Sequence, residues 1–432
     1  MKKSFLRTAR KGAVATTAIA ALTLAACSSS ESTDGASGAN GAAEVENADG
    51  RGPITFAMGS NDLDKIQPIV DAWNADHPDE QVTIHDLGNE SGDQRNTLVQ
   101  SLEAGNAEYD VMALDVIWTG YFAAQGWLVP LEGDFAVDTS GLLQPTVDSA
   151  TYNDTLYALP QNTNGQLLFR NTDLAPEPVN NFEDVRSACE ALQDDQNCLI
   201  TQLSQYEGIT VNTAGFMEGW GGSVLNDDQS PNVDSAESKE GLQALVDAVE
   251  DETISPESQE ATEAETEQAF LRGDTAFAIN WPYMFDSALD ADGSKGSNAK
   301  NVEVQPLVGK DGVGVSTLGG YNNGININSE HKATALDFIK FIISEESQMS
   351  FAEKAFPPVL ASIYDDAALA EELPYLPALK ESLENAVPRP VSPFYDAISK
   401  AIQDNAYAAL YSGKSVDDAT ADMKSAIESA QG

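Results

Sequence analysis

The sequence predicts an α/β fold of two lobes, each a mainly parallel sheet flanked by helices, with a ligand cleft at the hinge between them. Three observations support this. Strand-like apolar runs alternate with helical patterns from residue 53 onward. About 380 residues follow the N-terminal region, too many for one ordinary core. The order of the segments also implies two or three crossings between lobes, as a hinged pair requires.

The first part of the chain alternates regularly between strand and helix patterns. Apolar, β-branched runs predict strands at 53–58, 81–85 and 109–114. Between them, apolar residues spaced three and four apart predict helices at 61–74 and 93–104. This order indicates a largely parallel sheet, in which ligands bind beyond the carboxyl ends of the strands.

The rest of the chain is predicted to cross to a second lobe, return, and finish on the second. Extended pieces at 157–160 and 167–169 flank a polar turn at the first crossover. Further strands are expected at 275–280, 302–308 and 321–326. Helical patterns occupy 181–192, 237–249, 262–271, 333–344, 376–386, 395–410 and 416–429. We therefore assign 51–163 plus 300–358 to the first lobe and 164–299 plus 359–432 to the second.

The N-terminal region has the layout of a secretory signal. Five basic residues within the first eleven precede an uncharged stretch of about fifteen, too short for a permanent membrane span. It ends in Leu24-Ala25-Ala26-Cys27, which resembles the lipobox of bacterial lipoproteins and implies cleavage after residue 26 and acylation of Cys27. An uncleaved anchor, or a secreted protein with a stray cysteine, are the alternatives. Residues 27–52, rich in Ser, Gly and Ala, are interpreted as a flexible tether.

The composition is strongly acidic. The formal net charge is −46, and removing the five basic residues of 1–26 would bring it to −51. Nucleic acid and anionic lipid headgroups are poor partners for such a surface. Because the acidic surplus is spread along the chain, we favour a highly solvated surface over a site for a cationic ligand.

Two cysteines remain after Cys27, and they are close in sequence. Cys189 and Cys198 are predicted to form a structural disulfide in an oxidising compartment. The three histidines lie elsewhere, so neither a metal site nor another cofactor is expected.

Five ordered stretches resemble one protein family. They are Tyr109–Trp118, Gly126–Leu131, Tyr157–Pro160, Phe270–Tyr283 and Leu318–Tyr321. The chain is similar to the bacterial extracellular solute-binding proteins of ABC importers, in the branch of maltose- and trehalose-binding proteins. The resemblance implies a type II periplasmic-binding-protein-like fold and a monomer held at the outer face of the cell membrane. It also implies a sugar ligand and delivery to the transmembrane subunits of an ABC permease.

Sugar binding needs aromatic faces for pyranose rings and polar groups for their hydroxyls. Trp281 and Tyr283 follow a predicted strand and, in an extended segment, would point the same way. They are the first stacking candidates, against the alternative of ordinary packing at a strand end. The secondary aromatic candidates are Trp118, Trp220 and Tyr321.

Polar candidates in the first lobe lie at predicted strand ends. Asp115 is expected to accept a hydroxyl, or else to cap the following helical turn. Asn89 and Glu90 follow the second strand, in a loop that faces the sugar in trehalose-type relatives, with Gln94 or Arg95 next. The alternative is that this loop only caps a helix.

Four further candidates lie later in the chain. Asn162 belongs to the polar stretch at the first crossover, and Glu263 resembles a ligand-contacting acid of the trehalose branch, although a solvated helix face explains it as well. Gly320 would let the backbone approach a ligand, or make a turn. Arg389, between two prolines, is a fork-shaped donor that could reach the cleft.

No motif in the sequence indicates an enzyme. Nucleophile-elbow, phosphate-loop and metal-ligand patterns are absent from the sequence, and nothing singles out a pair of carboxylates as in a glycoside hydrolase. We therefore expect a binding protein without catalysis. Its expected ligand is trehalose, then maltose or a maltodextrin. A glycerophosphodiester or a peptide is the alternative, and a secreted glycoside hydrolase comes last.

Overall fold

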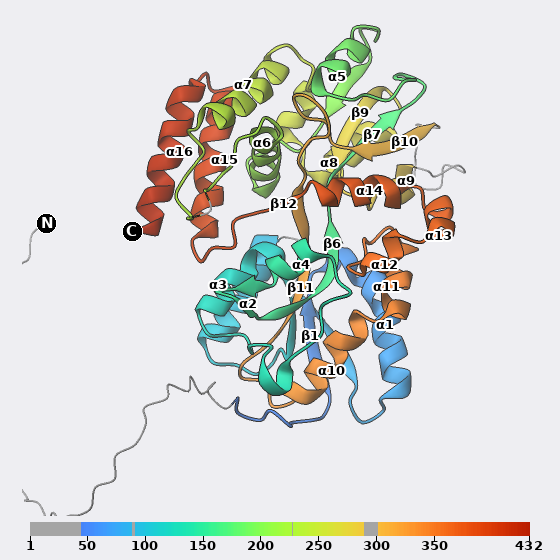
Figure 1. Ribbon diagram of the computed structural model, residues 1–432, viewed down its shortest axis with the longest axis vertical. Helices are drawn as coiled ribbons and strands as arrows, with labels where there is room; N and C mark the ends of the chain where they lie inside the picture. Colours follow the sequence, from blue (N-terminus) through green and yellow to red (C-terminus); the bar gives the residue numbers. More distant parts are fainter. Residues whose placement is uncertain (1–44, 89–90, 227, 289–300) are drawn as a thin grey trace, which may run out of the picture. The chain divides into compact units, whose positions relative to one another are not determined.

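The computed structural model describes residues 45–88, 91–226, 228–288 and 301–432. From Val45 onward the chain forms one compact unit. This unit contains a six-stranded and a four-stranded sheet, which Figure 1 shows one below the other. We call the half that holds the six-stranded sheet the first lobe and the other half the second lobe.

The first sheet has the strand order β12-β11-β3-β1-β2, and β6 pairs with β11. β1 pairs in parallel with β2 and β3, whereas β11 is antiparallel to β3 and to β6. β11 runs the opposite way because it enters the sheet from the second lobe. The strands are β1 (Ile54–Met58), β2 (Val82–Asp86), β3 (Val111–Asp115), β6 (Ala158–Asn164), β11 (Thr317–Ile325) and β12 (Val387–Pro388).

The second sheet has the order β10-β7-β9-β8. β8 and β9 are parallel, but β7 is antiparallel to both of its neighbours. β7 follows β6 almost directly and so enters from the first lobe. Each predicted parallel sheet is therefore interrupted by a strand that arrives from the other lobe. The strands are β7 (Leu167–Asn171), β8 (Asn197–Ile200), β9 (Thr275–Asn280) and β10 (Val302–Pro306).

The position of β10 bears on one predicted boundary between the lobes; the boundaries themselves stay a prediction. β10 pairs with β7 over five residues in the second sheet, although residues 300–306 had been assigned to the first lobe. This pairing favours a return to the first lobe after Pro306.

Two layers of helices cover the first sheet. α1, α10 and α11 pack on one face, where Ile66, Ile69, Val70 and Trp73 of α1 join Phe56 in a buried cluster. α2 and α3 pack on the other face. Their bounds are α1 (Leu63–Asp76), α2 (Ser91–Glu103), α3 (Thr119–Ala124), α10 (Lys332–Ile342) and α11 (Glu345–Ala352). Shorter elements of this lobe are η1 (Ser60–Asp62), η2 (Val116–Trp118), η3 (Gly133–Phe135), α4 (Gln144–Ser149), β4 (Thr151–Tyr152) and β5 (Thr155–Leu156).

The second sheet also lies between two cores. One core includes α5 (Phe182–Cys189), α6 (Glu207–Gly219), α7 (Ala236–Glu250), α15 (Tyr395–Tyr411) and α16 (Val416–Gln431). The other includes α8 (Glu263–Leu271), α9 (Met284–Ala288), α12 (Ala361–Tyr364), α13 (Ala367–Glu372) and α14 (Tyr375–Glu384). A further short element is η4 (Pro256–Glu260). The disulfide between Cys189 and Cys198, which the sequence predicted, joins the end of α5 to β8.

Ser316 links the three segments that pass between the lobes. Its hydroxyl accepts a hydrogen bond from the backbone N–H of Gln166, between β6 and β7 (2.7 Å). Its carbonyl accepts from the N–H of Val387 at the start of β12 (3.0 Å). Ser382, near the end of α14, donates to the carbonyl of Gln166 (2.9 Å). The crossings therefore meet at one buried residue.

We expect Ser316→Ala to lower the free energy of unfolding by about 2 kcal/mol, because the buried N–H of Gln166 loses its acceptor. Urea unfolding measures this change. The matched control is Thr172→Ala, which removes a hydroxyl bonded to the carbonyl of Asn301 at an exposed position (3.1 Å) and should cost well under half as much. Equal effects of the two substitutions would argue against a special role for Ser316.

Glu218, near the end of α6, is predicted to make stability depend on pH. Burial raises the pKa of this carboxyl to about 8, and its Oε2 makes no hydrogen bond to the described residues. The folded state therefore keeps a proton that the unfolded state releases near pH 4.3. Stability should fall as the pH rises from about 5 to 8, by about 2 kcal/mol between pH 6 and 9 once the partial exposure of Glu218 is taken into account.

The test is to compare urea unfolding of the parent protein and Glu218→Gln at pH 6 and pH 9. The variant should lack this part of the decline and be the more stable protein at pH 9. Glu190→Gln, at an exposed position after α5, is the control and should follow the parent. Parallel pH profiles of the parent and Glu218→Gln would contradict the prediction.

Within the part of the chain that the structure describes, no helix is long and apolar enough to cross a membrane.

Candidate functional site

Three candidate side chains form a row across the first sheet. Tyr321 of β11 lies directly opposite Asp115, the last residue of β3, and directly opposite Asn162 of β6. Residues directly opposite each other in antiparallel strands point to the same face. Asp115, Tyr321 and Asn162 therefore share one face of the sheet, at the end where β3 and β6 finish.

The polar stretch that holds Asn162 is a strand rather than the expected turn. β6 continues through Asn164 and pairs with β11, with a bulge opposite Tyr321 and Asn322. Pairing with β11 satisfies the backbone hydrogen bonds of β6. These backbone bonds form equally well whether the side chains are polar or apolar. The side chain of Gln161 and the Oδ1 atoms of Asn162 and Asn164 make no hydrogen bond to the described residues. These buried atoms lack the partners that buried polar groups usually have, and ordered water or a ligand hydroxyl would supply them.

Two adjacent glycines of β11 allow close packing at this row. Gly320 has φ of +119°, and a Cβ there would lie 2.4 Å from the carbonyl oxygen of Asn162. A Cβ on Gly319 would lie 3.0 Å from the indole Cζ3 of Trp281. Only glycine suits position 320, and Gly319 gives the Trp281 ring its place beside β11.

Trp281 and Tyr283 do not lie in an extended segment. β9 ends at Asn280, and the chain turns at Pro282 to begin α9, with the N–H of Phe285 bonded to the carbonyl of Pro282 (2.9 Å). The expectation that both rings point the same way along a strand is therefore wrong. Trp281 contacts Gly319, whereas the hydroxyl of Tyr283 donates to the backbone carbonyl of Glu263 (3.2 Å).

Glu263 starts α8, and its half-buried position brings an acid close to two tyrosines. Burial, followed by the charge of Glu263, raises the pKa of Tyr206. Burial and then the charges of Glu267 and Glu263 raise the pKa of Tyr283. Both phenols therefore stay protonated at neutral pH, and the proton of Tyr283 is already used in its bond to Glu263.

The charges around Tyr321 show which groups meet at the end of the first sheet. Burial raises the pKa of Tyr321 most, and the charges of Asp62 and Asp115 raise it further. Asp62, at the end of η1, also has its own carboxyl pKa raised by burial. The side chains of Asp62 and Asp115 nevertheless keep 19% and 21% of their surface exposed. Two partly buried acids therefore lie near enough to Tyr321 to act on its hydroxyl.

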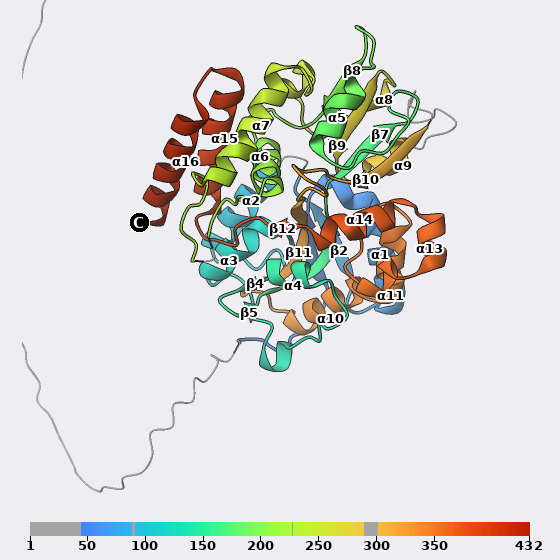
Figure 2. The same ribbon diagram turned by 45° about the horizontal axis from the view of Figure 1, so that its top comes forward.

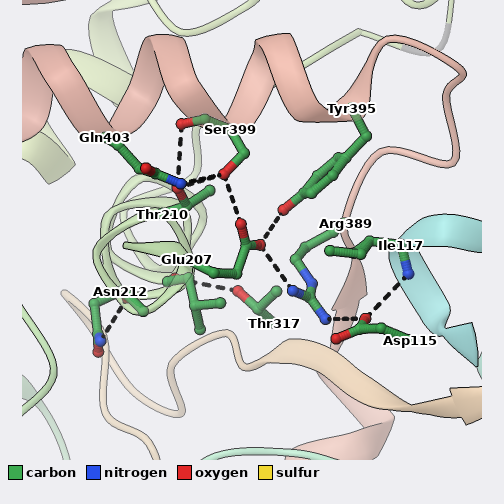
Figure 3. A network of polar contacts seen from close by, with 12 residues as sticks. Asp115, Ile117, Glu207, Thr210, Asn212, Thr317, Arg389, Tyr395, Ser399 and Gln403 are labelled. Atoms are coloured by element: carbon green, nitrogen blue, oxygen red, sulfur yellow. Dashed lines mark hydrogen bonds and ion pairs between the residues drawn. The ribbon is translucent and has the colours of Figure 1, made fainter. Parts of the chain in front are cut away.

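Arg389 joins the two lobes through paired carboxylates (Figure 3). Its Nη2 donates to Asp115 Oδ1 (3.1 Å) and its Nη1 to Glu207 Oε1 (2.8 Å). Glu207, the first residue of α6, also accepts from the hydroxyls of Tyr395 and of Ser399 (2.6 Å for Ser399). Arg389 is only 8% exposed, whereas the side chains of Asp115 and Glu207 keep 21% and 29% of their surface exposed.

Asp115 serves as a cap and as an ion-pair partner together. The backbone N–H of Ile117 donates to Asp115 Oδ1 (3.2 Å), so this carboxylate caps η2. Burial raises the pKa of Asp115, and the positive charge of Arg389 opposes that rise. A ligand hydroxyl at Asp115 would therefore meet a carboxylate already oriented by two donors.

These groups together offer an indole face, phenol donors and several carboxylate and amide acceptors. Such a set holds a polyhydroxylated ligand by stacking and hydrogen bonding. Among the described residues, no group of three or more His, Cys, Asp or Glu is arranged to hold a metal ion.

Comparison with protein families gives this site its context. Residues 59–349, about two thirds of the chain, match the family described as bacterial extracellular solute-binding protein. The chain belongs to this family.

Several proteins are similar to this solute-binding protein over most of its length. A probable ABC transporter-binding protein of Deinococcus radiodurans is 25% identical over 378 residues, which cover 83% of this chain and 88% of the relative. The structure of maltose-bound MalE3 of T. maritima matches with a TM-score of 0.78 and 28% identity, covering 87% of this chain and 99% of that one. The GacH receptor of Streptomyces glaucescens, solved unliganded and with acarbose, gives 0.77 at 21% identity and covers 88% and 98%. The two-lobed fold predicted from the sequence is thereby confirmed.

Of the remaining site predictions, two are bonded to other residues of the protein and three lie outside the described residues. Gln94 of the solute-binding protein is buried, and its amide donates to the carbonyl of Gly88 (2.8 Å). Arg95 pairs with Asp396 (2.6 Å). Asn89, Glu90 and Cys27 lie outside the residues that the structure describes.

Three residues of the cluster were missed by sequence reasoning: Asp62, Tyr206 and Glu207. Tyr206 and Glu207 lie where the chain leaves β8 and begins α6, and the carboxyl end of a strand is a usual ligand position. That signal could have found them, but neither β8 nor α6 was predicted. Asp62 lies just beyond β1, so the same rule applied to the first strand would have indicated it.

Proposed function

We propose that this solute-binding protein captures a small sugar outside the cytoplasmic membrane and delivers it to the permease of an ABC importer. The observation that carries the proposal is the Trp281 indole, placed beside the polar row of Asp115, Tyr321 and Asn162. An aromatic face next to carboxylates and amides suits the alternating C–H faces and hydroxyls of a pyranose. The relative in Deinococcus radiodurans is named a probable ABC transporter-binding protein, which supports the proposal that this protein serves an ABC importer.

The ligands proposed first are trehalose and maltose. MalE3 of T. maritima, which is 28% identical, was solved with maltose. The acids Asp62, Asp115 and Glu263 would repel phosphate, which disfavours a glycerophosphodiester. Capture would take place between open lobes that close about the crossings at Ser316, followed by docking on the permease and release. We propose that the protein acts as a monomer, needs no cofactor and catalyses no reaction.

We also propose that the protein is a lipoprotein held at the outer face of the cell membrane through Cys27. The sequence around Cys27 supports this anchor. Two or more acyl chains are enough to hold a protein stably at a bilayer. In the native host, Cys27→Ser should release the protein into the medium. Mass spectrometry of the membrane form should show a diacylglyceryl group. An unmodified N-terminus on the membrane-bound protein would contradict the anchor.

A thermal-shift screen of residues 45–432 tests the ligand. The screen should include trehalose, maltose, maltotriose, sucrose, glycerophosphocholine and a peptide mixture. A ligand at a hundred times its Kd adds about 2.7 kcal/mol to the folded state, so a true ligand shifts the melting temperature clearly. A shift with trehalose or maltose supports the proposal. A shift with only the phosphodiester or the peptides would overturn the sugar assignment.

A further inference from the structure

A groove of about 750 Å³ lies on the second lobe, between α5 and α7. It is lined by residues of both helices, by Trp220 after the end of α6 and by Lys310 from the segment between β10 and β11. Figures 1 and 2 show α5 and α7 beside each other, apart from the first sheet. None of the lining residues belongs to the cluster around Tyr321, so the groove is separate from the candidate site described above.

The floor of the groove is aromatic. The indole of Trp220 stacks on the ring of Phe216, with centroids 5.2 Å apart and planes 13° apart. Phe182 meets both rings edge-on, at 5.8 Å from Trp220 and 5.2 Å from Phe216. Phe216 covers one face of the indole, and Trp220 is still partly exposed and lines the groove. The exposed part of the indole is therefore available to a ligand.

Backbone hydrogen bonds hold this floor in place. The N–H of Phe182 donates to the carbonyl of Gly309 (2.9 Å), and the N–H of Lys310 donates to the carbonyl of Gly219 (3.2 Å). The start of α5, the end of α6 and the segment at 309–310 are thus tied together. A binding surface fixed in this way loses little conformational entropy when a ligand arrives.

The rim carries donors and acceptors on both sides of the aromatic floor. On α5, the guanidinium of Arg186 lies 5.5 Å from the ring centroid of Phe182 and pairs with Asp251. Lys310 pairs with Glu240 (2.7 Å). Exposed carboxylates of Glu183, Asp247 and Glu250 complete the rim. The two cations are already neutralised by partners, and three acceptors remain beside the indole.

We infer that this groove is a second carbohydrate site, which binds a neutral pyranose stacked on Trp220 with its hydroxyls bonded to the rim. A phosphorylated or carboxylated ligand would meet the uncompensated acids. A cation would use the indole face and the acids but would leave the donors of Arg186 and Lys310 without a partner on the ligand. A neutral ring with several hydroxyls uses the indole face, the donors and the acceptors together.

Fluorine NMR of the protein labelled with 5-fluorotryptophan tests the inference. The chain has five tryptophans, and the Trp220 and Trp281 signals are assigned with Trp220→Phe and Trp281→Phe variants. Maltose and trehalose are titrated to about 50 mM, and we expect the Trp220 signal to shift with a Kd of about 1–10 mM, as an open site implies. The same shift should occur in Trp281→Ala, which impairs the proposed sugar site. Because Trp220 and Trp281 give separate signals, loss of sugar binding at one site can be distinguished from loss at the other.

Variants of the rim provide the second measurement. A Glu183→Gln, Asp247→Asn double variant changes only exposed residues and should raise the Kd at Trp220 by about threefold or more. Glu190→Gln, an exposed acid that does not line the groove, should leave this Kd unchanged. A Trp220 signal that stays still with both sugars would overturn the inference. So would a signal that moves with choline and not with sugar, because the groove would then take a cation.

Discussion

Replacing Arg389 by methionine is expected to lower the free energy of unfolding by about 3–5 kcal/mol, one of the largest effects of any single substitution in this chain. Arg389 is bonded to Asp115 from the first lobe and to Glu207 from the second, and it is itself buried, while both carboxylates are partly buried. Methionine keeps most of the side-chain volume but leaves two partly buried carboxylates without their cation. Urea unfolding at neutral pH measures the change.

Two controls separate this ion-pair network from ordinary surface charge. Arg51 also bridges two carboxylates, those of Glu80 and Asp337, but its side chain is 51% exposed. Arg51→Met should therefore cost about 1 kcal/mol or less. Adding Asp115→Asn and Glu207→Gln to Arg389→Met should recover part of the loss, because no unpaired charge then remains. Equal costs for the two arginines would show that burial of the network contributes nothing.

Trp281→Ala is expected to weaken sugar binding by about 2 kcal/mol or more, roughly thirtyfold, if the indole stacks on the ligand. The ring is only partly buried, beside Gly319, and is not a member of the buried clusters, so the variant should still unfold cooperatively. Isothermal titration calorimetry with the sugar found in the thermal screen gives the affinity.

Gly319→Ala tests the same contact with the indole retained. The added Cβ would lie 3.0 Å from Cζ3 of Trp281 and 3.1 Å from the Cβ of Asn164, so the ring must move to make room. We expect a severalfold loss of affinity. Trp127→Ala removes a partly buried tryptophan that packs on Tyr121 and Phe122 and should leave affinity unchanged. If Trp281→Ala binds sugar normally, Trp281 has a packing role only.

The apolar elements of the first lobe could be predicted from the sequence because their patterns are strong. The helix expected at 61–74 is α1 at 63–76, and the strand expected at 109–114 is β3 at 111–115. Ile66, Ile69, Val70 and Trp73 repeat at helical spacing, and all four are buried. Asp115 was correctly placed at the end of its strand, although its pairing with Arg389 depends on a segment more than 270 positions away.

Elements without such a pattern were missed, and part of the site lies on them. α6 contains Gly208, Gly215 and Gly219 together with β-branched residues, and it is buried on nearly every side. Residues of low helix propensity remove the composition by which a helix is recognised. Burial on nearly every side removes the alternation of apolar and polar faces that would give a helical period. Two of its glycines are there for packing, since Gly215 and Gly219 lie against the backbone of Val315. Glu207 went unnoticed with its helix.

The late position of β11 in the chain affects how this protein assembles. β11 lies between β3 and β6 in the first sheet, yet it comprises residues 317–325 of 432. β3 and β6 therefore have no partner for these edges until about three quarters of the chain has been synthesised. Contacts so distant in sequence form slowly. If residues 1–26 are an export signal, as the sequence predicts, slow completion of the first sheet would keep the polypeptide unfolded long enough to cross the membrane before it folds.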